Sequence, residues 1–122
     1  MIRRKNSAEK RIETKLMETL LFDAKKEGSI KAVANILKNG GLVAIPTETV
    51  YGLAANAFDE EACSNIFKAK GRPGDNPLIV HISDLEMLDD IVAEFPEKAK
   101  LLAEKFWPGP LTVIFPRRPA IP

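Results

Sequence analysis

The sequence contains few of the residues on which disulfide-bonded, metal-binding and membrane proteins depend. Its 122 residues include one cysteine, one histidine, one tryptophan and one tyrosine. A single cysteine cannot pair within the chain, which excludes a disulfide scaffold. The lack of a His/Cys cluster argues against a transition-metal site. The longest unbroken apolar runs are about four or five residues, far too short to cross a membrane.

A targeting segment is also lacking, because no apolar stretch follows the basic start of the chain. We therefore expect a soluble protein of a reducing compartment, most simply the cytoplasm. Hydrophobic residues make up 45% of the chain and the formal net charge is +1. A chain this apolar and this close to neutral has enough apolar surface to bury, so disorder is excluded. Its length predicts about one small domain.

The near-neutral total conceals a basic N-terminal part. Residues 1–38 contain ten Lys/Arg against five acids, whereas the remaining residues contain eight against twelve. The N-terminal charges of both signs alternate at nearly helical spacing. This pattern favours a solvated helix face over a patch that binds nucleic acid.

Several capping signals predict helices. Asn6 and Glu9 form a capping box that opens a helix near residues 7–27, whose apolar stripe includes Leu20 and Leu21. The other predicted helix signals are Ser29 as a cap, Asn39-Gly40-Gly41 as a left-handed end, Asp59 as a cap, Ser83 with Glu86 as a capping box, and Pro96 in a first turn with Ala99, Leu102, Ala103 and Phe106 inward.

Short apolar runs predict strands. Residues 42–45, 78–82 and 111–115 are too short for helices and indicate buried strands, and residues 47–56 indicate a strand passing into a loop. Helices alternating with strands imply a mixed α/β fold, a sheet with helices packed on it. Three strands make a thin sheet, and no closing element follows residue 115, so we expect a fragment of a larger domain.

The densest chemical signal is a group of three cations. Lys68, Lys70 and Arg72 lie within five residues, where a helix gives way to a loop rich in glycine and proline. Arginine binds two phosphate oxygens at once and lysine acts as a point charge, so the group suits a polyphosphate. A solvated helix end, where cations meet the helix dipole, explains the same charges.

A second signal follows the first predicted strand, where Thr47 and Tyr51 offer a hydroxyl and a phenol. Ligands of open sheets bind at strand ends, so these groups suit a small polar molecule. The alternative is an edge strand with Tyr51 half in the core. His81 is more simply a core histidine, and Cys63 plain core. Thr112 follows Trp107-Pro-Gly-Pro110 and offers its hydroxyl to the same cleft.

Four motifs occur in order along the chain. They are Pro46-Thr-Glu-Thr-Val-Tyr-Gly-Leu53, Lys68-Ala-Lys-Gly-Arg-Pro73, Asp75-Asn-Pro-Leu-Ile-Val-His81 and Trp107-Pro-Gly-Pro-Leu-Thr112. Together they closely resemble the YrdC-like family of threonylcarbamoyl-AMP synthases. The resemblance runs from about residue 40 to residue 115, roughly the first half of that family's catalytic domain. One departure is Ala54, where the family usually has glycine.

The resemblance implies an enzyme that joins L-threonine, bicarbonate and ATP into threonylcarbamoyl-AMP and releases pyrophosphate, with Mg²⁺ on the phosphates. Other proteins then transfer the group to tRNA. It implies a three-layer fold around a twisted sheet of parallel and antiparallel strands. The site residues it implies are Lys68, Lys70 and Arg72 for the ATP phosphates, Lys68 and Arg72 being catalytic, Thr112 for the nucleotide, and Thr47, Tyr51 and His81 for threonine.

The resemblance also divides the chain into a basic helical extension with a first helix, residues 1–39, and a catalytic part, residues 40–122. The sequence ends before the family's Ser-x-Asn motif, so we expect the chain alone to bind nucleotide weakly or not at all. Two alternatives stay open. One is a YrdC-like domain that makes carbamoyl-adenylate from carbamoyl phosphate, and the other is a non-catalytic RNA-binding module with steeply salt-dependent binding.

Overall fold

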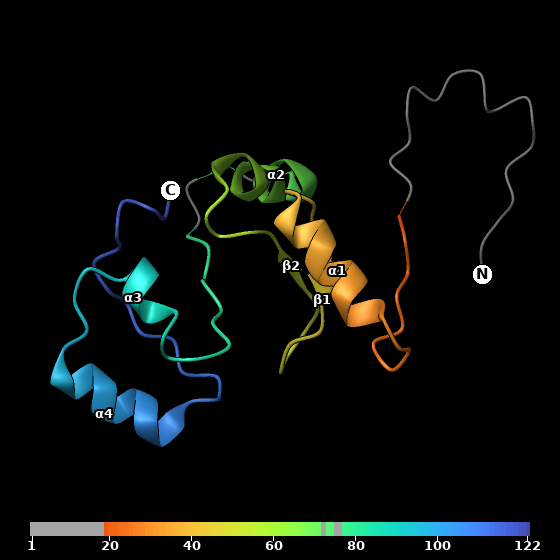
Figure 1. Ribbon diagram of the computed structural model, residues 1–122. Helices are drawn as coiled ribbons and strands as arrows, with labels where there is room; N and C mark the ends of the chain where they lie inside the picture. Colours follow the sequence, from red (N-terminus) through yellow and green to blue (C-terminus); the bar gives the residue numbers. More distant parts are fainter. Residues whose placement is uncertain (1–18, 72, 75–76) are drawn as a thin grey trace, which may run out of the picture.

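The structure is a computed structural model that describes residues 19–71, 73–74 and 77–122. Its elements are α1 (Ser29–Lys38), β1 (Val43–Ile45), β2 (Gly52–Ala54), α2 (Glu60–Lys70), α3 (Leu88–Ile91) and α4 (Glu97–Phe106). Figure 1 shows α1, the two strands and α2 in one group and α3 with α4 in another. The predicted mixture of helices and strands is confirmed.

The helix predicted near residues 7–27 is wrong over its described part, and residues 1–18 lie outside the described residues. Residues 19–27 contain no helix and turn only from residue 24 onward, and Leu20 is 59% and Leu21 100% exposed. Asp23 organises one turn, because its Oδ1 accepts a hydrogen bond from the Lys25 amide at 3.0 Å and its carbonyl accepts one from Lys26. An apolar stripe stabilises a helix only when it packs on something, and both of these leucines expose most of their surface.

Helix α1 confirms its predicted end but not its predicted cap. It begins after Gly28, whose φ of 79° is left-handed, and Ser29 is the first helical residue rather than the cap. At the other end the Gly40 amide donates to the Leu37 carbonyl and the Gly41 amide to the Ile36 carbonyl. These two bonds form the Schellman motif that a left-handed glycine after the helix favours.

Strands β1 and β2 form a two-stranded antiparallel sheet. Val43 pairs with Ala54, Ala44 with Leu53, and Ile45 with Gly52. The predicted strand at 42–45 is confirmed, but it is not buried, since Ala44 is exposed and its neighbours are half-buried. The order predicted for residues 47–56 is reversed: the loop comes first and the strand second, because an antiparallel pair needs a connecting loop after Pro46.

Helix α2 follows its sequence signals at both ends. The Asp59 side chain accepts a hydrogen bond from the Ala62 amide at 3.0 Å, and Gly71 ends the helix with a φ of 60°. Ala62 and Ile66 are buried at 1% and 5% exposure, and Cys63 is half-buried beside them. Ala62 and Ile66 therefore form the inward face of this helix.

The two later strands predicted from apolar runs are wrong. Residues 78–82 and 111–115 are extended but belong to no strand, and the described residues hold only the sheet of β1 and β2. Ile79 is 60% exposed and Ile114 94% exposed. An extended segment becomes a strand only when a neighbour pairs with its backbone, and the described residues supply no such neighbour.

The second group of elements has its own small core. Leu88, Ile91 and Val92, from α3 and the residue after it, form its centre. The side chains packed against them are Ile82, Phe95, Trp107, Phe115 and Ile121. Arg118 fastens the C-terminal segment to this core, because its Nε donates to the Val92 carbonyl at 3.0 Å and its amide to the Ile91 carbonyl at 2.9 Å.

The predicted capping box at Ser83 and Glu86 is replaced by Asp84, whose Oδ1 accepts from the Met87 amide at 3.1 Å before α3 begins. Helix α4 follows Pro96 as predicted, with its alanines at positions 99 and 103 buried, whereas its larger apolar residues are not. Leu102 is 44% exposed and Phe106 is 49% exposed.

None of the helices in the described ranges is long and apolar enough to cross a membrane.

Candidate functional site

The loop between β1 and β2 holds the first candidate site residues. Thr47 organises this loop: its hydroxyl donates to the Val50 carbonyl and accepts from the Thr49 amide at 3.3 Å. Threonine hydroxyls stabilise turns in this way. Tyr51, at the end of the loop, is 76% exposed, so the interpretation that places it half in the core is wrong. Its phenol is open to solvent and accessible to a ligand.

The last turn of α2 holds the second group. Lys68 and Lys70 are both exposed there, and Lys68 donates from Nζ to Asn65 Oδ1 at 3.0 Å. Cations at a helix C-terminus are favoured by the helix dipole. The bond to Asn65 directs the Lys68 ammonium along the helix surface. Arg72 lies outside the described residues.

The remaining candidates lie in the two extended segments. His81 is exposed, so the interpretation as a core histidine is wrong, and its Nδ1 lies 3.1 Å from the Ile79 carbonyl. Thr112 is also exposed. It follows a loop held by Trp107, whose indole Nε1 donates to the Leu111 carbonyl at 2.7 Å. Both side chains are therefore open to solvent.

The structure brings some of these residues together and separates others. Thr47 and Tyr51 share one loop, and Lys68 and Lys70 share one helical turn. Figure 1 shows the loop between β1 and β2 extending away from α2, at the far end of the strands. Within the described residues, the loop between β1 and β2 and the last turn of α2 therefore lie apart.

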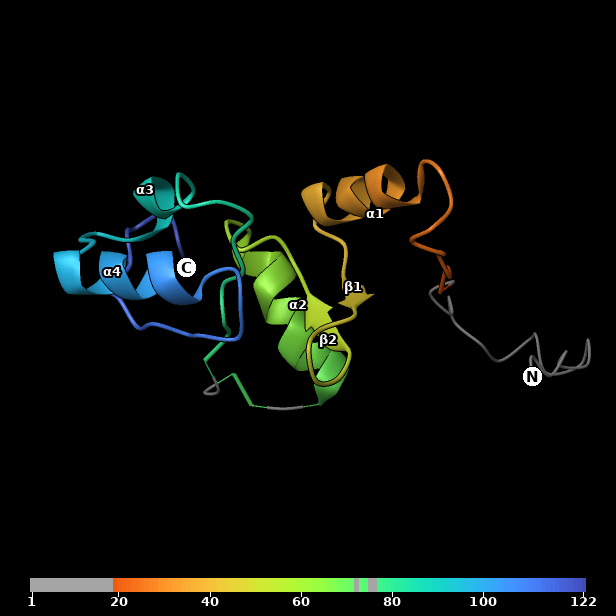
Figure 2. The ribbon, with the colours of Figure 1, turned by 90° about the horizontal axis from the view of Figure 1, so that it is seen from below.

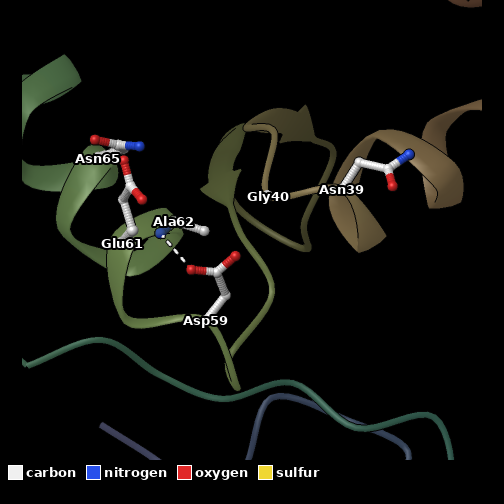
Figure 3. Close-up of a pocket in the computed structure, with 6 residues that line it drawn as sticks. All are labelled: Asn39, Gly40, Asp59, Glu61, Ala62 and Asn65. Atoms are coloured by element: carbon white, nitrogen blue, oxygen red, sulfur yellow. Dashed lines mark hydrogen bonds between the residues drawn. The ribbon is translucent and has the colours of Figure 1, made fainter.

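A polar pocket of about 210 Å³ lies where α1 ends and α2 begins. Figure 3 shows Asp59 bonded to the Ala62 amide, with Glu61 and Asn65 on successive turns of α2 and Asn39 at the end of α1 across from them. Half of the lining residues, Asn39, Gly40 and Asp59, belong to helix caps, and none of the six is a candidate derived from the sequence motifs. The capping signals predicted Asn39, Gly40 and Asp59 one by one. They did not predict that the end of α1 and the beginning of α2 lie close together.

Cys63 lies just inside α2. Its thiol donates to the Asn56 carbonyl at 3.4 Å. Burial, and secondly the negative charge of Asp59, raise the pKa of this thiol above its ordinary value. A thiol held protonated is a poor nucleophile, so Cys63 suits packing rather than catalysis. Across the described ranges, no three His, Cys, Asp or Glu side chains are grouped so as to hold a metal ion.

Comparison with known proteins places the chain in a family. The Sua5–YciO–YrdC family, described as "Telomere recombination", matches residues 35–122. The chain belongs to this family, whose match covers every candidate residue named above.

The curated relatives carry a more specific name. A threonylcarbamoyl-AMP synthase from Pyrococcus abyssi is 54% identical over 97 residues, which are 80% of this chain and 28% of the relative. The enzyme of that name from Bacillus subtilis is 54% identical over 90 residues, covering 74% of this chain and 26% of the relative. The chain thus spans about a quarter of the length of these relatives.

A solved structure agrees in fold. The crystal structure of P. abyssi Sua5 complexed with L-threonine matches with a TM-score of 0.77 and 51% identity, over 84% of this chain and 30% of that chain. The mixed α/β fold predicted from the sequence is therefore that of a solved relative, over the part that the two share.

Proposed function

We propose that this protein takes part in the synthesis of threonylcarbamoyl-AMP from L-threonine, bicarbonate and ATP. The observation that carries the proposal is that the family match, residues 35–122, includes all the motifs that suggest this reaction. Two relatives at 54% identity bear the name of the enzyme. A third line of support is the relative solved with L-threonine.

The chemistry explains why cations and hydroxyls are the groups needed. The threonine amine attacks the carbon of bicarbonate, a C–N bond forms, and water leaves to give a carbamate. A carbamate oxygen then attacks the α-phosphorus of ATP, and the bond to pyrophosphate breaks. Every reactant is an anion or becomes one, so the protein has to position the reactants and neutralise negative charge.

The residue roles are those that the family motifs imply, and the charges and exposure of the described side chains support them. Lys68 and Lys70, exposed on one helical turn, bind the ATP phosphates together with Arg72. Lys68 and Arg72 also stabilise the charge that develops as pyrophosphate leaves. Mg²⁺ would bind mainly to phosphate oxygens and water, and so adds positive charge without a protein cage.

The remaining candidates bind the other parts of the substrates. Thr47 and Tyr51 present a hydroxyl and a phenol from one loop, and with His81 they bind threonine. Thr112 contacts the nucleotide. All are half-buried or exposed, which leaves their polar atoms accessible.

The same proposal includes the division of the chain, the fate of the product and the location of the reaction. Residues 1–39 form an N-terminal extension with the first helix, and residues 40–122 form the catalytic part. The product reaches tRNA through downstream transfer proteins, with direct RNA contact through the basic residues. The reaction takes place in the cytoplasm.

The test measures pyrophosphate release from ATP with and without threonine and bicarbonate. It uses this chain and a hybrid in which the chain replaces its 97 matching residues in the P. abyssi relative. We expect release by the hybrid only when both substrates are present. Lys68→Ala should lower that rate about a hundredfold, as loss of one transition-state donor does.

A matched control is Lys100→Ala, which removes an exposed lysine from α4 and should leave the rate unchanged. A rate of pyrophosphate release that is the same with and without threonine and bicarbonate would contradict the proposal. Equal rates of pyrophosphate release in the Lys68→Ala and Lys100→Ala variants of the hybrid would also contradict it.

A further inference from the structure

The residue that ends α1 belongs to a dipeptide with a chemistry of its own. Asn39 is followed by Gly40, and it is the only asparagine of the chain that precedes a glycine. In an Asn-Gly pair the backbone nitrogen of the glycine attacks the carbonyl carbon of the asparagine side chain and closes a five-membered ring. Glycine favours this reaction because it has no side chain to block the attack and its backbone rotates freely. The sequence therefore makes Asn39 the asparagine most prone to lose its side-chain amide.

The Asn39 side chain is open to water. Asn39 is exposed, and Figure 3 shows its side chain pointing away from Asp59 and from the other labelled side chains. Figure 2 shows the chain leaving the end of α1 and turning towards β1. Water therefore reaches the side-chain amide at this turn.

The backbone at the end of α1 slows the ring closure in two ways. The Gly40 nitrogen has to lose its proton before it attacks, and its N–H donates to the Leu37 carbonyl at 3.1 Å. The ring also needs the Asn39 Cβ and the Gly40 nitrogen on the same side of the Asn39 Cα–C bond. At the observed ψ of 19°, the backbone nitrogen of Asn39 occupies that side instead. The ring therefore closes only after the helix end opens and this torsion changes.

The end of α1 is a place where such opening costs little free energy. Helix α1 contains no buried residue, and the bonds from the Gly40 and Gly41 amides close its last turn. Helix ends with few buried contacts open locally without unfolding the whole protein. The folded helix end thus slows the reaction without preventing it.

We propose that Asn39 is a modification site, whose side-chain amide is lost from states in which the end of α1 is open. The Gly40 nitrogen gives its proton to hydroxide and bonds to the Asn39 Cγ, and the side-chain nitrogen leaves as ammonia. Water then opens the ring at either carbonyl, which gives aspartate or isoaspartate at position 39. The reaction needs only water and hydroxide, and it is independent of the enzymatic function proposed above.

Either product weakens the junction of α1 and α2. Isoaspartate adds one atom to the main chain between the Asn39 Cα and the Gly40 nitrogen, which displaces the amides that end the helix. Both products carry a negative charge at the helix C-terminus, where the helix dipole is already negative. The charge also lies at a pocket that Asp59 and Glu61 line. The modified chain should therefore be less stable than the unmodified one.

The first test measures the loss of each asparagine amide by peptide mass spectrometry. The chain is incubated in heavy-oxygen water at mildly alkaline pH, folded and in urea, so that ring opening labels the product. In urea, Asn39 should react at least about tenfold faster than Asn35, which comes from the same helix but precedes the β-branched Ile36. In the folded chain, Asn39 should react at least about tenfold more slowly than in urea, because the helix end has to open first.

A substitution at Gly41 tests the helix end without changing the Asn39-Gly40 pair. A Cβ on Gly41 would lie 2.9 Å from the Ile36 carbonyl oxygen, which accepts the Gly41 amide. Gly41→Ala should therefore speed the reaction of the folded chain about tenfold and leave the rate in urea unchanged. Gly74→Ala, with open space around it, is the matched control and should change neither rate.

The effect of the product is tested separately. Asn39→Asp carries the new charge and should lower the thermal midpoint by a few degrees. Added salt should reduce this loss, because it screens exposed charges. An unchanged midpoint would contradict the expected weakening of the junction.

Three results would overturn the proposal. Equal rates at Asn39 and Asn35 in urea would show that the Asn-Gly pair has no special reactivity here. Equal rates at Asn39 in the folded and the unfolded chain would show that the helix end does not control the reaction, and so would a folded-state rate that Gly41→Ala leaves unchanged. The first two comparisons use the unaltered chain, so they decide the matter even where Gly41→Ala fails to fold.

Discussion

Replacing Asp59 with alanine should destabilise the protein by a predictable amount. The Asp59 carboxylate accepts the Ala62 amide at 3.0 Å, and its carbonyl accepts the Cys63 amide at 2.9 Å. Alanine keeps the second bond and removes the first. Loss of an N-cap costs about 0.5–2 kcal/mol. Ala62 is only 1% exposed, so water replaces the lost partner poorly, and we expect a loss of about 1.5–2 kcal/mol, near the upper end.

Asp59→Asn separates the hydrogen bond from the charge. Asparagine caps a helix about as well as aspartate but carries no charge for the helix dipole. Asp59→Asn should therefore lower the free energy of unfolding by less than about 1 kcal/mol, which is the stabilisation that one exposed charge gives at a helix N-terminus. The difference between the two variants measures the cap itself.

The assay is thermal or urea unfolding followed by circular dichroism. For a domain of this size, about 1 kcal/mol corresponds to a shift of about 4–8 °C in the midpoint. The reasoning is wrong if the alanine and asparagine variants lose equal stability, because the effect is then one of charge. It is equally wrong if Asp59→Ala has no measurable effect, because the buried amide then finds another partner.

Two further predictions concern packing and pH. A Cβ on Gly41 would lie 2.5 Å from Ile36 Cγ2, so Gly41→Ala should cost about 1–3 kcal/mol in unfolding experiments. Gly74→Ala, with open space around it, is the control and should cost little, and equal losses would contradict the steric argument. The Cys63 thiol should react slowly with iodoacetamide near neutral pH, because its pKa is raised. The unfolded chain loses that proton first as pH rises, so stability should fall above the ordinary thiol pKa, and Cys63→Ala should remove this fall. Rapid alkylation of Cys63 at neutral pH would contradict the prediction of a raised thiol pKa. The same fall of stability with pH in Cys63→Ala would also contradict it.

The helix ends show what the sequence predicts well. Asp59 caps α2, and the glycines after α1 and α2 adopt the left-handed geometry expected of them. These features depend on bonds between residues only a few positions apart. Such bonds need nothing from the rest of the molecule, so the local sequence is sufficient to specify them.

The strands and the N-terminal helix show where the same reasoning fails. Residues 78–82 have a strand's composition but pair with no strand among the described residues, and Leu21 of the predicted apolar stripe is 100% exposed. Strand pairing and helix packing both depend on residues far away in the sequence. Apolar pattern alone indicates what a segment is able to form and not whether a partner is present.

The candidate site, too, could be predicted from the sequence only in part. The motifs predict a set of candidate side chains, and the family match covers the positions of all of them. They did not predict that Tyr51 and His81 are open to solvent, or that the loop after β1 extends away from α2 (Figure 1). The polar pocket beside Asp59 also appears only when two helix ends meet.

The sequence by itself determined the family, the helix ends and the kinds of side chain at the candidate site. Each of these depends on residue type and short spacing, which the linear chain records. Only the tertiary structure decided that segments 78–82 and 111–115 join no sheet among the described residues, and that the last turn of α2 lies apart from the loop between β1 and β2. The physical reason is that a sheet and a closed site are made by contacts between distant segments, and a contact forms only where both of its members are present.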